Sequence, residues 1–282
     1  MRVATWNIRA AIGPGEPFPA GWWRHVTDER FERICAVIRE LDADVVALQE
    51  VSFYDVDGEV HDQPLALARE TDRHVRYGAV HAYSLIDPRS GRTIGSATWG
   101  NALLTREPIR GGFTFGLPVG ADDDPVEPAG SGLPLAGIRF LDAPYGTREP
   151  RCAVGGAVAV DGGPEVTVIS THLAYAGGAQ RAAQAEALAG IATEREGPLV
   201  LLGDFNAAID SAELRSVRTA LHDAFAAVGV EPGDARRHSC GPLAIDHIFV
   251  RGLSVDACRV VAEAGDASDH LPVVATLRTE VG

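Results

Sequence analysis

The sequence predicts one domain of mixed β-strands and α-helices. Two observations support this: short apolar runs of strand length recur along the chain, and apolar residues at helical spacing lie between some of them. The 282 residues contain no internal repeat and no stretch with the composition of an inter-domain linker. Because a chain of this length can bury a sizeable core in one unit, we expect a single domain that spans residues 1–282.

Eight apolar runs are candidates for strands. Each is short and rich in Val, Leu and Ile, which is typical of strands that are buried on at least one face. In chain order the runs are 3–8, 45–48, 102–104, 154–160, 166–170, 199–202, 245–250 and 272–277.

Four segments have the pattern of helices. In the first, Phe31, Ile34 and Leu41 lie at helical spacing. Thr27 or Asp28 can cap the start of this helix, because a short polar side chain there accepts a backbone N–H bond. The other predicted helices are 64–70, 180–194 and 212–221.

Residues 111–150 differ from the rest of the chain. Eighteen of these 40 residues are Gly, Pro or Asp, which is the composition of a loop. We therefore expect a long loop insertion around 111–150. Long loops in compact domains often border functional sites, and a solvated insertion without function is the alternative.

The charge balance makes some partners less favourable than others. The net charge is −14, and all 25 basic residues are Arg, because the chain has no Lys. Tight binding of nucleic acid without sequence preference needs a basic surface, so nucleic acid is possible but not favoured as a partner. The sequence indicates no oligomeric state.

Other features concern compartment and redox chemistry. No apolar run approaches the roughly 18–20 residues of a membrane-spanning helix, so we expect no membrane span. The first ten residues read as a strand and not as a signal peptide, which predicts a cytoplasmic protein. The four cysteines form no C-x-x-C pair, so a cysteine zinc site is not expected.

Polar side chains gather where the predicted strands begin or end. A buried strand that ends in a carboxylate, amide or imidazole carries costly polar groups to the edge of the core. One such end is chance, but six suggest one site at one edge of a sheet. The residues are Asn7, Glu50, His172, Asp204, Asn206, Asp246, Asp269 and His270.

The residue types at these strand ends indicate which metal ion and which kind of reaction the site suits. Carboxylate and amide oxygens without sulfur suit Mg²⁺ or Mn²⁺, and Mg²⁺ leaves coordination positions for water and a phosphate oxygen. The two histidines supply proton transfer near neutral pH. Arg151 can hold a phosphate oxygen with its planar guanidinium group. Together these features predict metal-assisted hydrolysis of a phosphate ester.

Seven short segments resemble the endonuclease/exonuclease/phosphatase superfamily of metal-dependent hydrolases. They follow the order and spacing of that superfamily across nearly the whole chain. The segments are 5–8 (TWNI), 48–51 (LQEV), 100–104 (GNALL), 171–173 (THL), 203–206 (GDFN), 245–249 (IDHIF) and 268–272 (SDHLP).

The resemblance implies an α+β fold, a four-layer α/β/β/α sandwich. Two packed, mostly antiparallel β-sheets would be flanked by helices, with the site at one end. It also implies that Glu50 is the principal metal ligand, with Asn7 and Asp269 beside it. The ion would be Mg²⁺ or Mn²⁺, and the sequence is compatible with one ion or two.

The resemblance implies catalytic roles as well. Asp204, aided by Asn206, would orient or deprotonate the attacking water. His270 would pair with Asp246, and His172 would contact the phosphate or move a proton.

Three neighbouring residues complete the expectations for the site. Arg151 and Asn101 are expected to bind the substrate. His247 lies one residue from Asp246, so on a strand it would point to the opposite face and serve the structure.

These observations predict a hydrolase of phosphoric esters that depends on Mg²⁺ or Mn²⁺. The substrate would be a phosphate ester, and a phosphodiester that is small or derived from lipid is favoured. A nuclease acting on DNA or RNA is the alternative. A binding protein that keeps the fold without catalysis is a third hypothesis, whose mark would be an incomplete set of ligands.

Overall fold

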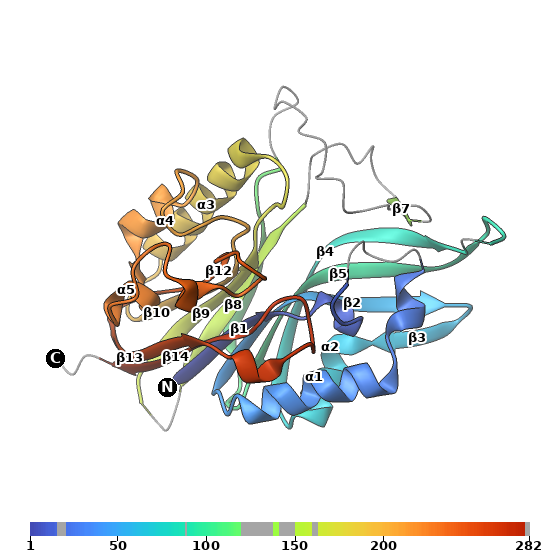
Figure 1. Cartoon of the computed structure of the whole chain (residues 1–282), viewed down its shortest axis with the longest axis horizontal. Helices are drawn as coiled ribbons and strands as arrows, with labels where there is room; N and C mark the ends of the chain where they lie inside the picture. Colours follow the sequence, from blue (N-terminus) through green and yellow to red (C-terminus); the bar gives the residue numbers. More distant parts are fainter. Residues whose placement is uncertain (16–20, 88, 120–137, 141–149, 160–162, 280–282) are drawn as a thin grey trace.

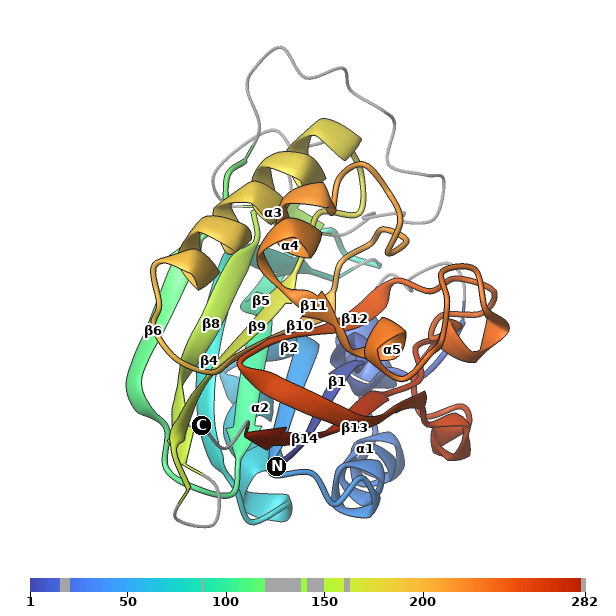
Figure 2. The same ribbon diagram turned by 90° about the vertical axis from the view of Figure 1, so that its left-hand side faces the viewer.

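The strands of the protein form two sheets that pack face to face, with helices on both outer sides (Figures 1 and 2). The computed structural model describes residues 1–15, 21–87, 89–119, 138–140, 150–159 and 163–279. Within these residues one sheet has eight strands and the other has six. The four-layer α+β sandwich is therefore confirmed.

The eight-stranded sheet has the order β13-β14-β1-β2-β5-β4-β7, with β3 paired to the far end of β2. The pair β1–β2 is parallel, and the other described pairs of this sheet are antiparallel. Its strands are β1 (Arg2–Asn7), β2 (Val45–Val56), β3 (Glu59–Asp62), β4 (His74–Ile86), β5 (Thr93–Thr105), β7 (Ile138–Phe140), β13 (Leu253–Val260) and β14 (Val273–Thr279).

The six-stranded sheet has the order β11-β12-β10-β9-β8-β6. The pair β9–β10 is parallel, and the remaining described pairs are antiparallel. Its strands are β6 (Arg110–Gly116), β8 (Cys152–Ala159), β9 (Glu165–His172), β10 (Leu199–Asp204), β11 (His222–Asp223) and β12 (Asp246–Arg251).

Alternation along the strands builds three apolar layers. On β10, Val200 and Leu202 point into the core between the sheets, where Val3 of β1 meets them. Leu199 and Leu201 point outward beneath α3 and α4, and α1 and α2 cover the outer face of the other sheet. The helices are α1 (Asp28–Glu40), α2 (Gln63–Glu70), α3 (Gly178–Thr193), α4 (Arg215–Ala220) and α5 (Ala224–Ala227).

The predicted elements are present, with shifted ends. Each of the eight apolar runs overlaps a strand within the described residues, and the four helical patterns correspond to α1–α4. Helix α1 begins at Asp28, and the Thr27 hydroxyl caps it by accepting a hydrogen bond from the Arg30 backbone N–H. The sequence patterns did not predict β3, β4, β7, β11 or β13.

The expected loop around 111–150 begins with a strand, so that part of the prediction is wrong. Residues 110–116 form β6, which pairs with β8 at the edge of the six-stranded sheet. Composition hid this strand, because Gly111 and Gly112 lie at an irregularity in the pairing while Phe113 and Phe115 follow in alternation. Residues 138–140 form β7, and the segments 120–137 and 141–149 lie outside the described residues.

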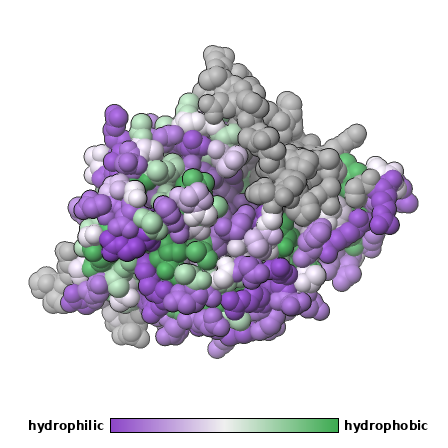
Figure 3. All heavy atoms as spheres, viewed as in Figure 1, coloured by the Kyte–Doolittle hydropathy of each residue, from purple (hydrophilic) through white to green (hydrophobic). Residues whose placement is uncertain are grey.

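The face that Figure 3 shows is mainly hydrophilic, with apolar residues in small separate areas. This agrees with the burial of apolar side chains in the layers of the sandwich. In the part of the chain that the structure describes, no helix is long and apolar enough to cross a bilayer. The four cysteines are free thiols, and Cys35, Cys152 and Cys258 are buried.

Candidate active site

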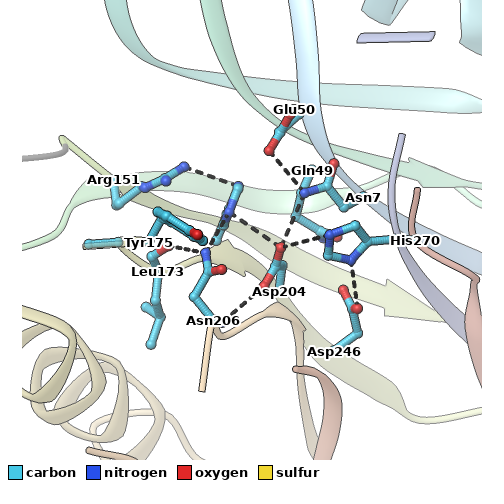
Figure 4. Close-up of polar contacts among 12 residues, drawn as sticks. Asn7, Gln49, Glu50, Arg151, Leu173, Tyr175, Asp204, Asn206, Asp246 and His270 are labelled. Atoms are coloured by element: carbon cyan, nitrogen blue, oxygen red, sulfur yellow. Dashed lines mark hydrogen bonds and ion pairs between the residues drawn. The ribbon is translucent and has the colours of Figure 1, made fainter. Parts of the chain in front are cut away.

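The ends of strands from both sheets meet at one edge of the sandwich (Figure 4). The Asn7 side chain, at the end of β1, joins the sheets, because its Nδ2 atom donates to Glu50 Oε1 at 3.0 Å and to Asp204 Oδ2 at 3.1 Å. The parallel pairs β1–β2 and β9–β10 explain this meeting, since each pair carries its polar residues at the same end. The structure therefore brings the predicted strand-end residues together.

Glu50 does not follow the end of a strand, as the sequence predicted, but lies within β2. Leu48 pairs with Ala102 and Val51 with Gly100, so two residues of β2 face one residue of β5. This β-bulge gives Glu50 a φ of 56°, which is unusual for a residue other than glycine. Bulges redirect side chains, and the strand continues to Val56 beyond this one.

The surroundings of the Glu50 carboxyl disfavour its ionised form. Burial raises its pKa above 4.5, and the negative charge of Asp269 raises it further. The Asn7 hydrogen bond and the charges of His270 and Arg151 oppose this rise without cancelling it. A cation between Glu50 and Asp269 would favour the ionised form, so these two residues fit a divalent metal ion.

The Asn7 amide is oriented differently from the prediction of an oxygen ligand. Its Oδ1 atom accepts a hydrogen bond from the Arg9 backbone N–H at 3.0 Å. Its Nδ2 atom therefore faces Glu50 and Asp204, whose carboxylates can only accept when ionised. In this structure Asn7 stabilises the two carboxylates as a donor, because the backbone of Arg9 already contacts the oxygen.

Asp204 is the buried centre of the site. It is 1% exposed, and burial together with the nearby charge of Asp246 raises its pKa from 3.8 to about 7. Its Oδ1 atom accepts the backbone N–H of Asn206 at 2.9 Å, and the φ of 48° at Asn206 closes this turn. A carboxyl with a pKa near neutrality is suited to accepting a proton from water.

The raised pKa of Asp204 has a consequence for stability. The folded pKa lies above the ordinary value of 3.8, so this group stabilises the fold at low pH and loses that contribution as the pH rises through about 7. In the absence of metal, the free energy of unfolding should therefore decrease between about pH 5 and 9 by more in wild type than in Asp204→Asn. Urea unfolding at both pH values in EDTA measures this. A wild-type-to-variant difference that does not change with pH would contradict it.

The predicted pairing of His270 with Asp246 is confirmed. His270 Nδ1 lies 2.8 Å from Asp246 Oδ2, which also accepts the Ser239 hydroxyl at 2.6 Å. Burial alone would lower the pKa of His270, but the charge and hydrogen bond of Asp246 hold it well above 6.5. The Trp6 indole N–H anchors the backbone here by donating to the His270 carbonyl at 2.8 Å. His270 is thus a positively charged donor whose Nε2 lies 3.8 Å from Asp204 Oδ2.

His172 lies on the other side of Asp204. Its Nδ1 atom is 3.1 Å from the Arg151 guanidinium. Nε2 faces Asp204 Oδ2 at 3.4 Å. Asn206 Nδ2, which donates to the Leu173 carbonyl, is 3.0 Å from the same ring nitrogen. Two histidines therefore flank one carboxylate.

Arg151 and Asn101 have different positions relative to this site. Arg151 directly precedes β8 and reaches the site through its contact with His172. Asn101 is 2% exposed and faces the bulge of β2. Its Nδ2 donates to the Cys152 carbonyl at 3.0 Å, which anchors the residue that follows Arg151. Direct substrate binding by Asn101 stays a prediction, and the observed contact supports the start of β8.

His247 points away from the site, as its position on the strand predicts. Its Nε2 atom contacts the Ala207 carbonyl at 2.9 Å, and its ring packs near Phe205 and Phe249. Burial lowers its pKa below 6.5, so the ring is neutral at physiological pH. His247 is therefore a buried structural residue and a suitable internal control for His270.

The sequence analysis did not identify Arg9 as part of the site. Arg9 is 4% exposed, and its Nε atom lies 3.3 Å from Asp269 Oδ2. The signal that could have drawn attention to it is its place two residues after Asn7. Proximity of Arg9 to Asp269 itself is invisible in sequence, because the two residues lie at opposite ends of the chain.

Ligand atoms of Asp204, Asp246 and His270 lie within 4.8 Å of one another, so this cluster could hold a metal ion. Asp246 and His270 are already paired there, and a charged imidazole repels a cation. The Asp246 Oδ1 atom is buried and has no hydrogen-bond partner among the residues that the structure describes. Glu50 nevertheless fits a divalent ion better, because burial and the neighbouring Asp269 charge raise its pKa.

Comparison with known proteins agrees with this geometry. The sequence profile of the Endonuclease/Exonuclease/phosphatase family matches residues 4–270, and the chain belongs to this family. The family is named for nucleases and phosphatases, enzymes that hydrolyse phosphoester bonds.

Individual relatives extend the comparison. A UPF0294 protein from Vibrio parahaemolyticus is 30% identical over 144 residues, which are 50% of each protein, so the chain spans about half the length of the curated relatives it matches. An endonuclease/exonuclease/phosphatase from Beutenbergia cavernae is 26% identical, with a TM-score of 0.67 over 99% of this chain and 71% of that one. A mannosyl-6-phosphatase from Bacteroides thetaiotaomicron shares the fold at 17% identity, with a TM-score of 0.62 over 99% of both chains.

Proposed function

We propose that the protein hydrolyses phosphoric esters with Mg²⁺ or Mn²⁺, and that its substrate is a phosphodiester that is small or derived from lipid. The observation that carries the proposal is the buried Asp204 carboxylate, which lies between His172 and His270 and contacts Asn7. These groups combine a proton acceptor, a charged donor and an adjacent carboxylate pair in one place.

Glu50 and Asp269 would hold the metal ion, with the Asn7 amide beside them. The support is the raised pKa of Glu50, which reflects the burial of this carboxyl and the negative charge of Asp269 beside it. Oxygen ligands of this kind are those that Mg²⁺ and Mn²⁺ prefer. When bound, the ion would supply Lewis-acid polarisation of a phosphoryl oxygen.

The surrounding residues would perform the proton transfers and bind the phosphate. Asp204 would orient a water molecule and accept its proton as the water oxygen bonds to phosphorus, while the turn at Asn206 fixes the carboxylate. The P–O bond to the leaving group would break in the same step, and the leaving oxygen would take a proton from solvent water and depart as an alcohol. His270, held charged by Asp246, would donate to a phosphoryl oxygen whose negative charge grows. Arg151 would bind another phosphate oxygen and keep His172 in place.

Charge supports the choice of substrate class. A phosphodiester carries one negative charge, which suits a site where Arg151 and His270 are the cations opposite Asp204. The net charge of −14 disfavours a long polyanion. The fold itself does not decide between diester and monoester, since a protein with this fold is described as a mannosyl-6-phosphatase.

The direct test is an assay of metal dependence on four substrates. These are bis-p-nitrophenyl phosphate, p-nitrophenyl phosphate, single-stranded DNA and a choline phospholipid, each with EDTA, Mg²⁺ or Mn²⁺. We expect diester hydrolysis that needs Mg²⁺ or Mn²⁺ and exceeds hydrolysis of the monoester. Activity that persists in EDTA, or that is confined to the monoester, would contradict the proposal.

Weak binding to duplex DNA is a separate expectation. A protein with net charge −14 and no Lys should not reach sub-micromolar affinity for duplex DNA without sequence preference at physiological salt. The few arginines near the site would release few counterions, so the salt dependence should be shallow. Fluorescence anisotropy measures both quantities, and sub-micromolar binding would favour a nuclease instead.

A further inference from the structure

We propose that Arg9 is a positioning residue that occupies one carboxylate oxygen of Asp269, so that the metal site favours Mg²⁺ over Ca²⁺. This inference rests on the metal site proposed above and names what selects the ion there. The argument depends on the position of Arg9, on the two oxygens of Asp269 and on the coordination chemistry of the two ions.

The backbone holds Arg9 in a strained and specific position. Arg9, Ala10 and Ala11 have φ values of 47°, 50° and 62°, so three consecutive residues other than glycine are left-handed. Such a run is costly and persists only where the surroundings enforce it. The Arg9 N–H donates to Asn7 Oδ1 at 3.0 Å, and the guanidinium donates to the Gly13 carbonyl at 3.2 Å. The side chain is therefore fixed at both ends.

The two oxygens of Asp269 have different surroundings. Oδ2 lies 3.3 Å from the Arg9 Nε atom, in an ion pair in which the Arg9 side chain is 5% exposed. Oδ1 lies 3.2 Å from the Ser268 hydroxyl oxygen. The same hydroxyl oxygen lies closer to the Asn7 carbonyl, at 2.8 Å. The Ser268 hydroxyl has one proton, and the shorter of its two hydrogen bonds is the one to the Asn7 carbonyl. A carboxylate oxygen has more than one lone pair, so Oδ1 keeps a lone pair for a metal ion beside its longer hydrogen bond from Ser268.

This division of the carboxylate suits a small ion. Mg²⁺ takes six ligands in a strict octahedron and binds carboxylates through single oxygens, together with several waters. Ca²⁺ takes six to eight ligands and commonly binds a carboxylate through both oxygens. With Oδ2 held by Arg9, Asp269 offers one oxygen, and the nearby guanidinium charge opposes a second close metal contact. Removal of Arg9 would free Oδ2 and improve the site for Ca²⁺.

The test is to titrate metal-free protein with MgCl₂ and with CaCl₂. Isothermal titration calorimetry gives the affinity for each ion, and the shift in Tm is the second readout. The variant is Arg9→Met, which has an uncharged side chain, and Arg9→Gln is the second variant in case the first does not fold. The matched control is Arg30→Met, because Arg30 donates to the Asp266 carbonyl in the same loop as Asp269. Glu50→Gln is titrated in parallel to test the metal site itself.

We expect the preference for Mg²⁺ over Ca²⁺ to fall by about tenfold in the Arg9 variants, the lower end of the range for residues that orient metal ligands. Arg30→Met should keep the wild-type ratio. An unchanged ratio of Mg²⁺ to Ca²⁺ affinity in a folded Arg9 variant would overturn the inference. If steady-state kinetics on bis-p-nitrophenyl phosphate also gave a raised KM, Arg9 would act on the substrate instead. If Glu50→Gln binds both ions as wild type does, the proposed metal site fails and the inference fails with it.

Discussion

His270→Ala and Asp246→Asn should each lower kcat by about 10²–10⁴-fold, the usual contribution of general acid–base catalysis. The reason is that Asp246 fixes the His270 ring through Nδ1 and keeps it charged, so either change removes the same charged donor. Both variants should fold, which circular dichroism and thermal unfolding can verify. Steady-state kinetics on bis-p-nitrophenyl phosphate in Mg²⁺ or Mn²⁺ measures the loss.

The double variant separates a functional pair from two independent residues. If His270 and Asp246 act as one unit, the double variant should lose much less activity than the product of the two single losses. His247→Ala is the control, because His247 is equally buried but contacts the Ala207 carbonyl on the opposite face. It should lower stability and keep most of kcat. A folded His247→Ala as inactive as His270→Ala would refute the assignment of the two faces.

Glu50→Gln should lower the affinity for Mg²⁺ and the activity by at least the roughly 10–100-fold that loss of a residue supporting a metal ligand costs. The same change should leave the metal-free protein at least as stable as wild type near pH 8. Burial and Asp269 raise the pKa of Glu50, so its ionised form is unfavourable in the fold without metal, and the neutral amide avoids this.

Thermal unfolding separates these two effects. In EDTA the Tm of Glu50→Gln should equal or exceed that of wild type, and MgCl₂ should raise the Tm of wild type but not of the variant. Glu165→Gln is the matched control, because this carboxylate lies at the far end of β9 and pairs with Arg110. A shift with Mg²⁺ that is the same in Glu50→Gln and wild type would place the ion elsewhere.

The sequence by itself determined the class of fold and pointed to the strand-end residues that the structure brings together at one edge. Apolar runs located the strands and amphipathic patterns located the helices, because both periodicities record which local residues are buried. Polar residues beside buried strands are costly, so their repeated occurrence pointed to one functional edge. The resemblance to the family implied the pair of His270 and Asp246, which the structure contains. The outward direction of His247 followed from its place on the strand, since alternate residues of a strand face opposite sides.

Strand pairing decided what local patterns could not show. The bulge at Glu50 depends on the register between β2 and β5, so the sequence suggested a strand end where the strand continues. The sequence also did not predict the strand at 110–116. Its composition is rich in glycine, and only the pairing with β8 makes it a strand.

Only the tertiary structure decided how the site is oriented and charged. The Asn7 amide turns its nitrogen to Glu50 and Asp204 because the Arg9 backbone takes its oxygen. Arg9 meets Asp269 although the two are far apart in the chain. The direction of a side chain and the charge around it depend on every element packed nearby, whereas periodicity in a sequence reports only the face on which a residue lies.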